Sequence, residues 1–104
     1  MTIVNRRVFY GKPGLAGPLV EHIREFGKLS AQHGMSLKER LLTDYASGRT
    51  DRVVWEWEVA DMAEFAKLES SMASNEAFVA GMTIWERKMN EMIDYAEVEN
   101  WTVQ

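Results

Sequence analysis

The stretch that decides the fold is residues 51–65, DRVVWEWEVADMAEF. Every second residue from Val53 to Val59 is apolar, and two of them are tryptophans; this period of two places successive side chains on opposite faces of a sheet. Asp61 and Glu64 then have the spacing of a capping box, with Asp61 as the N-cap and Glu64 at the third helical position. The stretch predicts a buried strand that runs directly into a helix.

The same patterns predict the elements on either side. Alternating β-branched and aromatic residues are typical of strands, whereas apolar residues three and four apart predict helices. Polar residues 46–51 are typical of a hairpin turn, and Ser74 or Asn75 is placed to cap a second helical segment. The expected strands are 3–10, 37–45, 51–59 and 95–103, and the expected helices are 18–34 and a region from 62 that is interrupted near 74–75.

The order of these elements, βαββαβ, predicts an α+β fold of the ferredoxin-like type. In this arrangement a four-stranded antiparallel sheet carries both helical regions on one face. With 104 residues, the chain is expected to be a single domain, 1–104, with one core.

The second face of the sheet then has no cover. The strands are nevertheless apolar on both alternations, as Trp55 and Trp57 against Val54 show in the third strand. A monomer would expose an apolar patch larger than soluble monomers usually tolerate. We therefore expect a homodimer in which two sheets pack face to face and close an α+β barrel, with two-fold symmetry.

Composition excludes several classes of function. The net charge is −4 and the basic residues are scattered, so we expect no nucleic-acid partner. Cysteine is absent, which removes disulfides, thiolate metal sites and cysteine nucleophiles. No signal segment or apolar run of about 20 residues is present, so a cytoplasmic protein without membrane insertion is expected. No sequence motif indicates a metal or a cofactor.

Charged side chains in strands expected to be central need a partner or a polar pocket, because a dry unpaired charge is costly. One interpretation is Arg–Glu pairing across the sheet, for which Arg6, Arg7, Glu56 and Glu58 are available. In the other, Arg7 shares an alternation with Asn5 and projects into the barrel lumen beside the third-strand tryptophans. There it would hold an anionic or carbonyl group of a ligand, with Glu56 or water as its partner when no ligand is bound.

A stripe of apolar side chains at helical spacing, Phe78, Met82, Trp85, Met89 and Met92, is most often plain core, although a pocket between helix and sheet would use the same residues. His22 and His33 lie about 16 Å apart along the first expected helix, too far to share a metal. His33 suits the last turn of that helix, and His22 suits a solvated helix face at least as well as a proton-transfer role. The candidate ligand-binding residues are therefore Arg7, Asn5, Trp55, Trp57, Trp85 and Glu56.

The chain also resembles the dimeric α+β barrel superfamily, and within it the NIPSNAP-like proteins. The shared features near the start are a first-strand arginine, an aromatic residue two positions later and a following Pro-Gly. Later in the chain they are a glycine-containing hairpin, an aromatic-rich strand, an acidic helix start and a second helical segment that carries an aromatic residue. In this sequence they are Arg7, Phe9, Pro13-Gly14, Gly48, VVWEWEV, Asp61 and the SNEAF run ending near Trp85. The resemblance implies a dimer with a lumenal pocket and leaves the chemistry open.

These observations leave three functions in play. The first is a cofactor-independent enzyme of monooxygenase, isomerase or cyclase type that acts on a small organic substrate. The others are a non-catalytic small-molecule-binding module and a purely structural dimer. An enzyme needs a polar group inside the cavity, whereas a filled interior favours the structural role.

Overall fold

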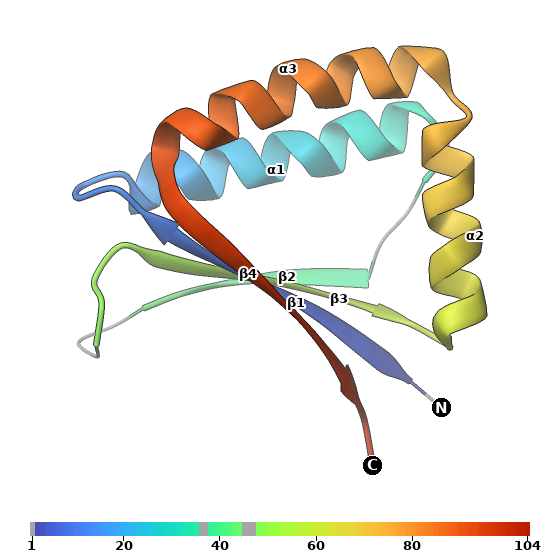
Figure 1. The fold of residues 1–104 in the computed structure, drawn as a ribbon, viewed down its shortest axis with the longest axis horizontal. Coiled ribbons are helices and arrows are strands. Elements are labelled where there is room, and N and C mark those ends of the chain that lie inside the picture. The colour runs from blue at the N-terminus through green and yellow to red at the C-terminus, as the bar shows by residue number, and fades with distance from the viewer. Residues whose placement is uncertain (1, 36–37, 45–47) are drawn as a thin grey trace.

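The computed structural model describes residues 2–35, 38–44 and 48–104. The elements in these ranges follow the expected order, except that the second helical region is two helices (Figure 1). The ends of the expected strand 37–45 and part of the following turn lie outside the described residues. The elements are β1 (Ile3–Gly11), α1 (Ala16–Gln32), β2 (Lys38–Thr43), β3 (Arg52–Val59), α2 (Met62–Ala73), α3 (Glu76–Met92) and β4 (Ile93–Thr102).

The four strands form one antiparallel sheet in the order β2-β3-β1-β4. This is the strand order of a ferredoxin-like fold, so the expected fold class is confirmed. β1 pairs with both β3 and β4, and Asn5 is opposite Trp57 of β3 and opposite Asn100 of β4. Strand β4 begins at Ile93, two residues before the expected start, because α3 passes into it without a loop.

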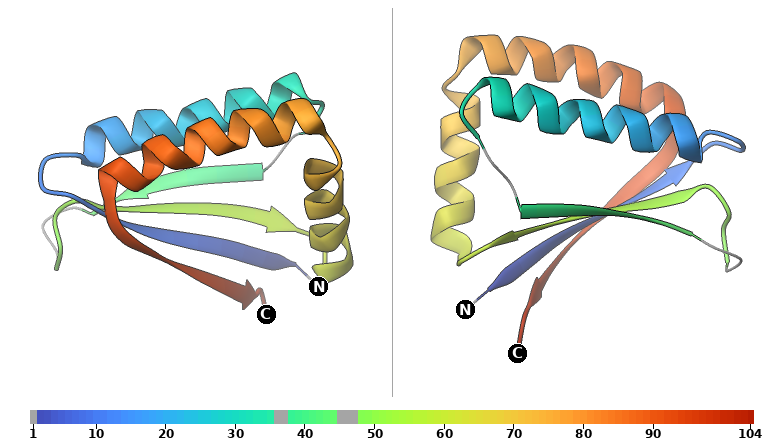
Figure 2. Two further views of the ribbon diagram at one scale, coloured as in Figure 1. Left: turned by 45° about the horizontal axis from the view of Figure 1, so that its top comes forward. Right: turned by 180° about the vertical axis from the view of Figure 1, so that it is seen from behind.

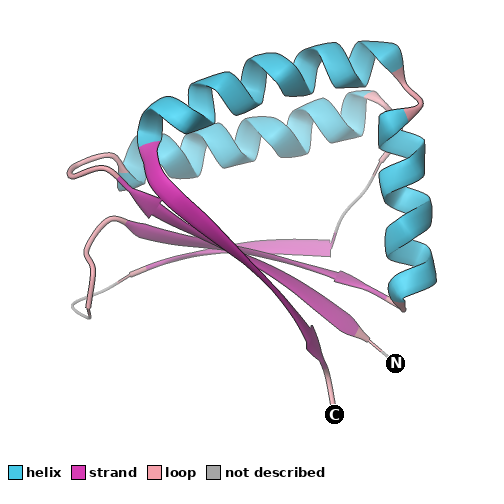
Figure 3. Cartoon of the chain, viewed as in Figure 1, coloured by secondary structure: helices cyan, strands magenta, loops and turns pink. Residues whose placement is uncertain are grey.

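The molecule has two layers, helices on one side and the sheet on the other (Figure 3). Helices α1 and α3 lie side by side over one face of the sheet, and α2 stands across one end of this layer (Figure 2). No described helix covers the opposite face, which we call the open face. The sheet therefore has a covered face and an open face, as the element order predicts.

The helix boundaries follow the expected capping residues. Asp61 Oδ1 accepts a hydrogen bond from the Glu64 backbone N–H at 2.8 Å, and Glu64 Oε2 accepts one from the Ala60 N–H at 2.6 Å. Asn75 accepts a hydrogen bond from the Phe78 N–H at 2.9 Å and begins α3. Gly34, with a φ of 74°, lies just past the end of α1, where a left-handed residue is common. Both predicted caps are confirmed.

The core lies between the sheet and the helices. Phe26 of α1 is at its centre, edge-on to Trp55 of β3 and to Phe78 of α3, with ring centroids 5.0 and 6.1 Å away. The expected stripe of α3 contributes Phe78 and Met89 as buried residues and its other members as partly buried ones. The fully buried part of the core is Ile3, Phe9, Leu19, Ile23, Phe26, Val53, Trp55, Trp57, Val59, Phe78 and Met89.

Candidate functional site

A polar cluster lies on the covered face at the centre of the sheet. Arg7 is half-buried there, and its Nε donates a hydrogen bond to Asn5 Oδ1 at 3.3 Å. The fully buried Asn5 amide in turn donates from Nδ2 to Asn100 Oδ1 of β4 at 2.8 Å. Within the described part of the chain, the terminal N–H groups of Arg7 donate to no residue. A positioned guanidinium therefore keeps its outer donors free.

Two tryptophans stand beside this cluster on β3. Trp55 is directly opposite Arg7 in the register, and its indole N–H donates to Glu39 Oε2 at 2.7 Å. Trp57 is opposite Asn5 and stacks on Phe65 of α2, with ring centroids 5.2 Å apart. The buried indole nitrogen of Trp57 has no acceptor among the described residues. Such a group is unusual, because buried donors are nearly always satisfied.

A recess of about 270 Å³ lies between α2 and α3. Carboxylates stand at its rim, Glu69 from α2 and Glu86 from α3, and both also act electrostatically on Arg7. The recess is therefore an apolar hollow bordered by two acids; Arg7 interacts electrostatically with both acids but is not among the residues that line it. Its apolar lining comes from Met72, Ala73, Phe78, Val79 and Met82.

Burial governs the electrostatics of Arg7. Removal from solvent lowers the pKa of the Arg7 guanidinium, and the nearby Glu69 and Glu86 carboxylates raise it by a smaller amount. In the described part of the chain neither carboxylate forms an ion pair with Arg7 or has another partner. An arginine stays charged in a protein, so its half-buried charge is left without a close counter-ion.

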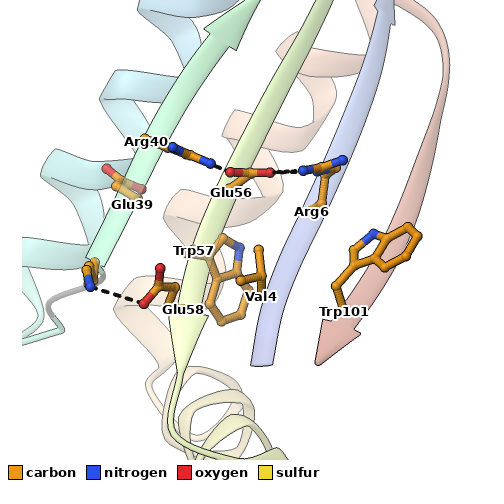
Figure 4. Close-up of a pocket in the computed structure, with 9 residues that line it drawn as sticks. Val4, Arg6, Glu39, Arg40, Glu56, Trp57, Glu58 and Trp101 are labelled. Atoms are coloured by element: carbon orange, nitrogen blue, oxygen red, sulfur yellow. Dashed lines mark hydrogen bonds and ion pairs between the residues drawn. The ribbon is translucent and has the colours of Figure 1, made fainter. Parts of the chain in front are cut away.

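On the open face, Glu56 lies between two arginines (Figure 4). Its side chain is buried and accepts hydrogen bonds from Arg6 Nε at 2.6 Å and from Arg40 Nε at 2.7 Å. Burial raises the pKa of Glu56, but the hydrogen bonds from Arg40 and Arg6 outweigh it and leave the pKa below its ordinary value. Hollows of about 520 and 480 Å³ lie on this face, and Arg6 lines both.

The structure thus divides the expected ligand-binding residues between two faces. Asn5, Arg7, Trp55 and Trp57 lie together on the covered face, as their shared alternation predicts. Glu56 lies on the open face and pairs with Arg6, so the expectation that it partners Arg7 is wrong. Arg7 lies on the face that the helices cover, whereas the expected lumen lies between two sheets.

Trp85 lies in a separate contact between α1 and α3. Its indole N–H donates to the His22 carbonyl at 2.7 Å, and His22 Nε2 lies 2.8 Å from the Trp85 carbonyl, which requires a proton on Nε2. The two rings also stack, with centroids 4.8 Å apart. His22 is buried, so the expected solvated position is wrong. His33 packs edge-on against Phe78 at the end of α1.

Sequence patterns did not identify Glu69, Glu86 or Asn100 as part of the site. A signal existed for Glu69, which lies four residues after Phe65 and therefore on the same side of α2. Asn100 shares the alternation of β4 that faces Asn5, but only the strand register brings the two together. Glu86 becomes recognisable only when α2 and α3 are placed against each other.

Two kinds of feature are absent from the described ranges. No helix in them is both long and apolar enough to cross a membrane. No group of three or more His, Asp or Glu side chains in them is arranged to hold a metal ion.

Comparisons with known proteins identify the fold. No family model and no curated protein sequence matches this chain. A NIPSNAP family protein from Agrobacterium tumefaciens superposes with a TM-score of 0.74 at 17% identity, over 100% of this chain and 94% of the other. An uncharacterised NIPSNAP domain protein from Burkholderia xenovorans has a TM-score of 0.76 at 16% identity, over 98% and 94%.

A third similar structure is SnoaB, a cofactor-independent oxygenase from Streptomyces nogalater. It has a TM-score of 0.68 at 12% identity and covers 99% of this chain and 93% of its own. At these identities the comparisons establish a shared fold. They confirm, at the level of fold, the expected likeness to NIPSNAP-like and barrel-type monooxygenase structures.

Proposed function

We propose that this protein binds a small organic molecule in the recess between α2 and α3, with Arg7 as its polar anchor, and that it works as a homodimeric α+β barrel. The observation that carries the binding proposal is the half-buried guanidinium of Arg7, whose outer donors are free within the described chain. A planar guanidinium with free N–H donors binds the two oxygens of a carboxylate, or a polarised carbonyl, with defined geometry.

The surroundings support a ligand of modest size. Small-molecule sites are mostly apolar with a few placed polar groups, and the recess combines Met72, Phe78 and Met82 with carboxylates that interact electrostatically with Arg7. The hydrogen bonds from Arg7 to Asn5 and from Asn5 to Asn100 hold the guanidinium in place. Little conformational freedom of the Arg7 side chain is therefore lost when a ligand binds.

A titration tests the binding proposal. Small aromatic carboxylates and ketones are screened, and each molecule that binds is titrated into wild type, Arg7→Met and Arg24→Met. Arg24 is an exposed α1 arginine paired with Glu21, so its variant controls for the lost charge. We expect Arg7→Met to weaken binding by about tenfold or more, as the loss of one charge-assisted contact implies, and Arg24→Met to leave it unchanged. Equal affinity in all three proteins would contradict the proposal.

The proposal of a homodimer is supported by the open face. Leu42, Tyr95 and Trp101 are between 40% and 53% exposed there, and the strand register places Val4, Val8 and Val54 among them. The Arg6–Glu56–Arg40 group already satisfies the central charges of this face. A second copy would cover these apolar side chains and enclose the two hollows.

A catalytic role without a cofactor is the second candidate. It is favoured by two carboxylates without a partner in the described chain, Glu69 and Glu86, which line one recess and interact electrostatically with the cation Arg7. Arg7 would stabilise an enolate oxygen while a carboxylate accepts the proton from the adjacent carbon. The similar fold of a cofactor-independent oxygenase is consistent with such chemistry.

Proton exchange tests this candidate. A 1,3-diketone is incubated in deuterated buffer with the protein, and deuterium uptake at the central carbon is followed by NMR. We expect uptake faster than in buffer with wild type and a return to the buffer rate in the Glu69→Gln/Glu86→Gln double variant. Uptake at the buffer rate with wild type would leave binding as the function.

A further inference from the structure

We infer that a second copy of this chain packs on the open face with the two-fold axis along the strands, so that β2 of one copy lies against β4 of the other. The inference rests on the proposed homodimer and adds which strands of the two copies meet. It follows from four charged side chains that cross the middle of the open face, which we call the charge row.

The charge row takes one side chain from each strand. The strand register places Arg40 of β2 beside Glu56 of β3. It places Arg6 of β1 between Glu56 and Glu99 of β4. Figure 4 shows Glu56 in line with its two arginines, and Glu99 lines the same hollow as Arg6. In the strand order β2-β3-β1-β4, the charges are therefore positive, negative, positive and negative.

The two ends of the charge row are its least satisfied members. Arg40 is exposed and donates to Glu56 through Nε, and its terminal N–H groups donate to no described residue. The half-buried carboxylate of Glu99 forms no hydrogen bond or ion pair with the described part of the chain. An oppositely charged partner is therefore missing at the two outer strands and not in the middle of the face.

A two-fold axis between two aligned sheets can run across the strands or along them. An axis across the strands places β4 over β4, so Glu97 and Glu99 meet the same two carboxylates of the second copy. Where the charge row lies on that axis, every charge faces its own copy. Like charges brought together in this way disfavour the arrangement.

An axis along the strands reverses the charge row instead. Arg40 then faces Glu99 of the partner subunit, and Glu56 faces Arg6 of the partner subunit. Because the row reads positive, negative, positive, negative, each of its charges meets an opposite one. Two copies of one surface are complementary in this arrangement, as an isologous interface requires.

The neighbouring rows of the open face fit the same axis. Val54 of β3 and Val8 of β1 are register partners, so reversal places each over the other. On the other side, Lys38 faces Trp101 of the partner subunit, a cation against an exposed indole. β2 and β4 run in opposite directions, so the edge strands of the two copies meet antiparallel and both free edges of the sheet disappear.

Charge reversal at the ends of the row tests the arrangement. Sedimentation equilibrium gives the dimer dissociation constants of wild type, Arg40→Glu, Glu99→Arg and the double variant. We expect each single reversal to raise the dissociation constant about tenfold or more, because it creates two like-charged pairs across the interface. The double variant should recover most of the loss. Three strand spacings, roughly 14 Å, separate β2 from β4, so this rescue cannot act within one chain.

Two controls make the same charge changes on the helices. Arg24→Glu and Glu91→Arg alter exposed side chains of α1 and α3, and both should dimerise like wild type. Thermal unfolding checks that each variant folds. This matters most for Arg40→Glu, because it leaves the buried carboxylate of Glu56 with one arginine.

Cross-linking gives a second measurement that needs no reversed charge. The chain has no cysteine, so each introduced thiol is the only one at its site. Arg40→Cys, Glu99→Cys and the variant with both changes are treated with a short bismaleimide. We expect a cross-linked dimer from the variant with both cysteines and none from either single variant.

The outcomes separate the inference from the homodimer. A monomeric wild type overturns both. If wild type dimerises and the single reversals dimerise equally well, the inference alone is overturned. Single-cysteine variants that cross-link to themselves also overturn it, because they place each outer strand against its own copy.

Discussion

Glu56 shows how one residue can hold a charge inside a sheet. It accepts hydrogen bonds from arginines of two neighbouring strands, which offset the desolvation of its carboxylate. Because the pKa of Glu56 is held below its ordinary 4.5, the unfolded chain binds the proton more readily than the folded one. Its stabilising effect is therefore fully present above about pH 4.5 and is lost as the pH falls through the lower folded pKa.

Glu56→Gln tests this effect. Denaturant unfolding of wild type and variant is compared from about pH 6 down to about pH 3, where paired carboxylates become protonated. We expect the free energy of unfolding of wild type to fall more steeply with acid than that of the variant, because Glu56 no longer titrates in the latter. Parallel pH profiles would show that the ion group contributes nothing to acid sensitivity.

At the scale of single residues, the sequence correctly predicted which side chains share a face of the sheet, because the alternation of a strand determines it. The alternation of β1 correctly grouped Asn5 with Arg7, and Arg–Glu pairing was one of two expected roles for the strand charges. The pattern does not say which face the helices cover, so Arg7 was assigned to the lumen. His22 was misjudged because its neighbours Glu21 and Glu25 are polar, while the ring that buries it belongs to Trp85, 63 residues away.

The boundary between β3 and α2 was the clearest element boundary in the sequence. Asp61 accepts from the Glu64 N–H, one of those that a helix start leaves free, and Glu64 accepts from the N–H of Ala60, the residue before the cap. Asp61→Ala should lower the free energy of unfolding by about 1 kcal/mol, the usual effect of losing an acidic N-cap. Chemical denaturation measures it, and Asp61→Asn, which keeps an acceptor, should recover most of the loss. A wild-type value for Asp61→Ala would mean that the cap does not stabilise the helix.

The other elements were predicted in kind but less well at their ends. The interruption at 74–75 was expected, whereas the turn of α2 across the end of the helix layer was not (Figure 1). Periodicity predicts which side of a helix is apolar, but it does not predict the direction of the helix axis. In α2 no residue is fully buried, so its apolar side is also weakly defined. Its direction depends on the stacking of Phe65 on Trp57, a contact between elements. The recess that it forms with α3 was for the same reason invisible in the sequence.

At the scale of the whole molecule, the two faces of the sheet have different tasks in our account. The open face would receive a second copy, and the covered face would receive the ligand. We expect sedimentation at micromolar concentration to give twice the 12.0 kDa of one chain, with an interface of roughly 2,000 Å² or more. Trp101→Glu should shift the protein towards monomer, since Trp101 is 53% exposed on the open face. A stable wild-type monomer would refute the barrel.

The most direct test of the central claim, that the ligand binds on the covered face, uses the chain's four tryptophans as reporters. Trp55 lies opposite Arg7 on the covered face, and Trp101 lines a hollow of the open face. Indole ¹⁵N–¹H signals are recorded during titration with the tightest-binding molecule from the screen of carboxylates and ketones, and the Trp55→Phe and Trp101→Phe spectra assign the two signals. We predict that the Trp55 signal shifts with saturation while that of Trp101 stays in place. A shift of Trp101 with Trp55 unchanged would place the ligand on the open face and contradict the account.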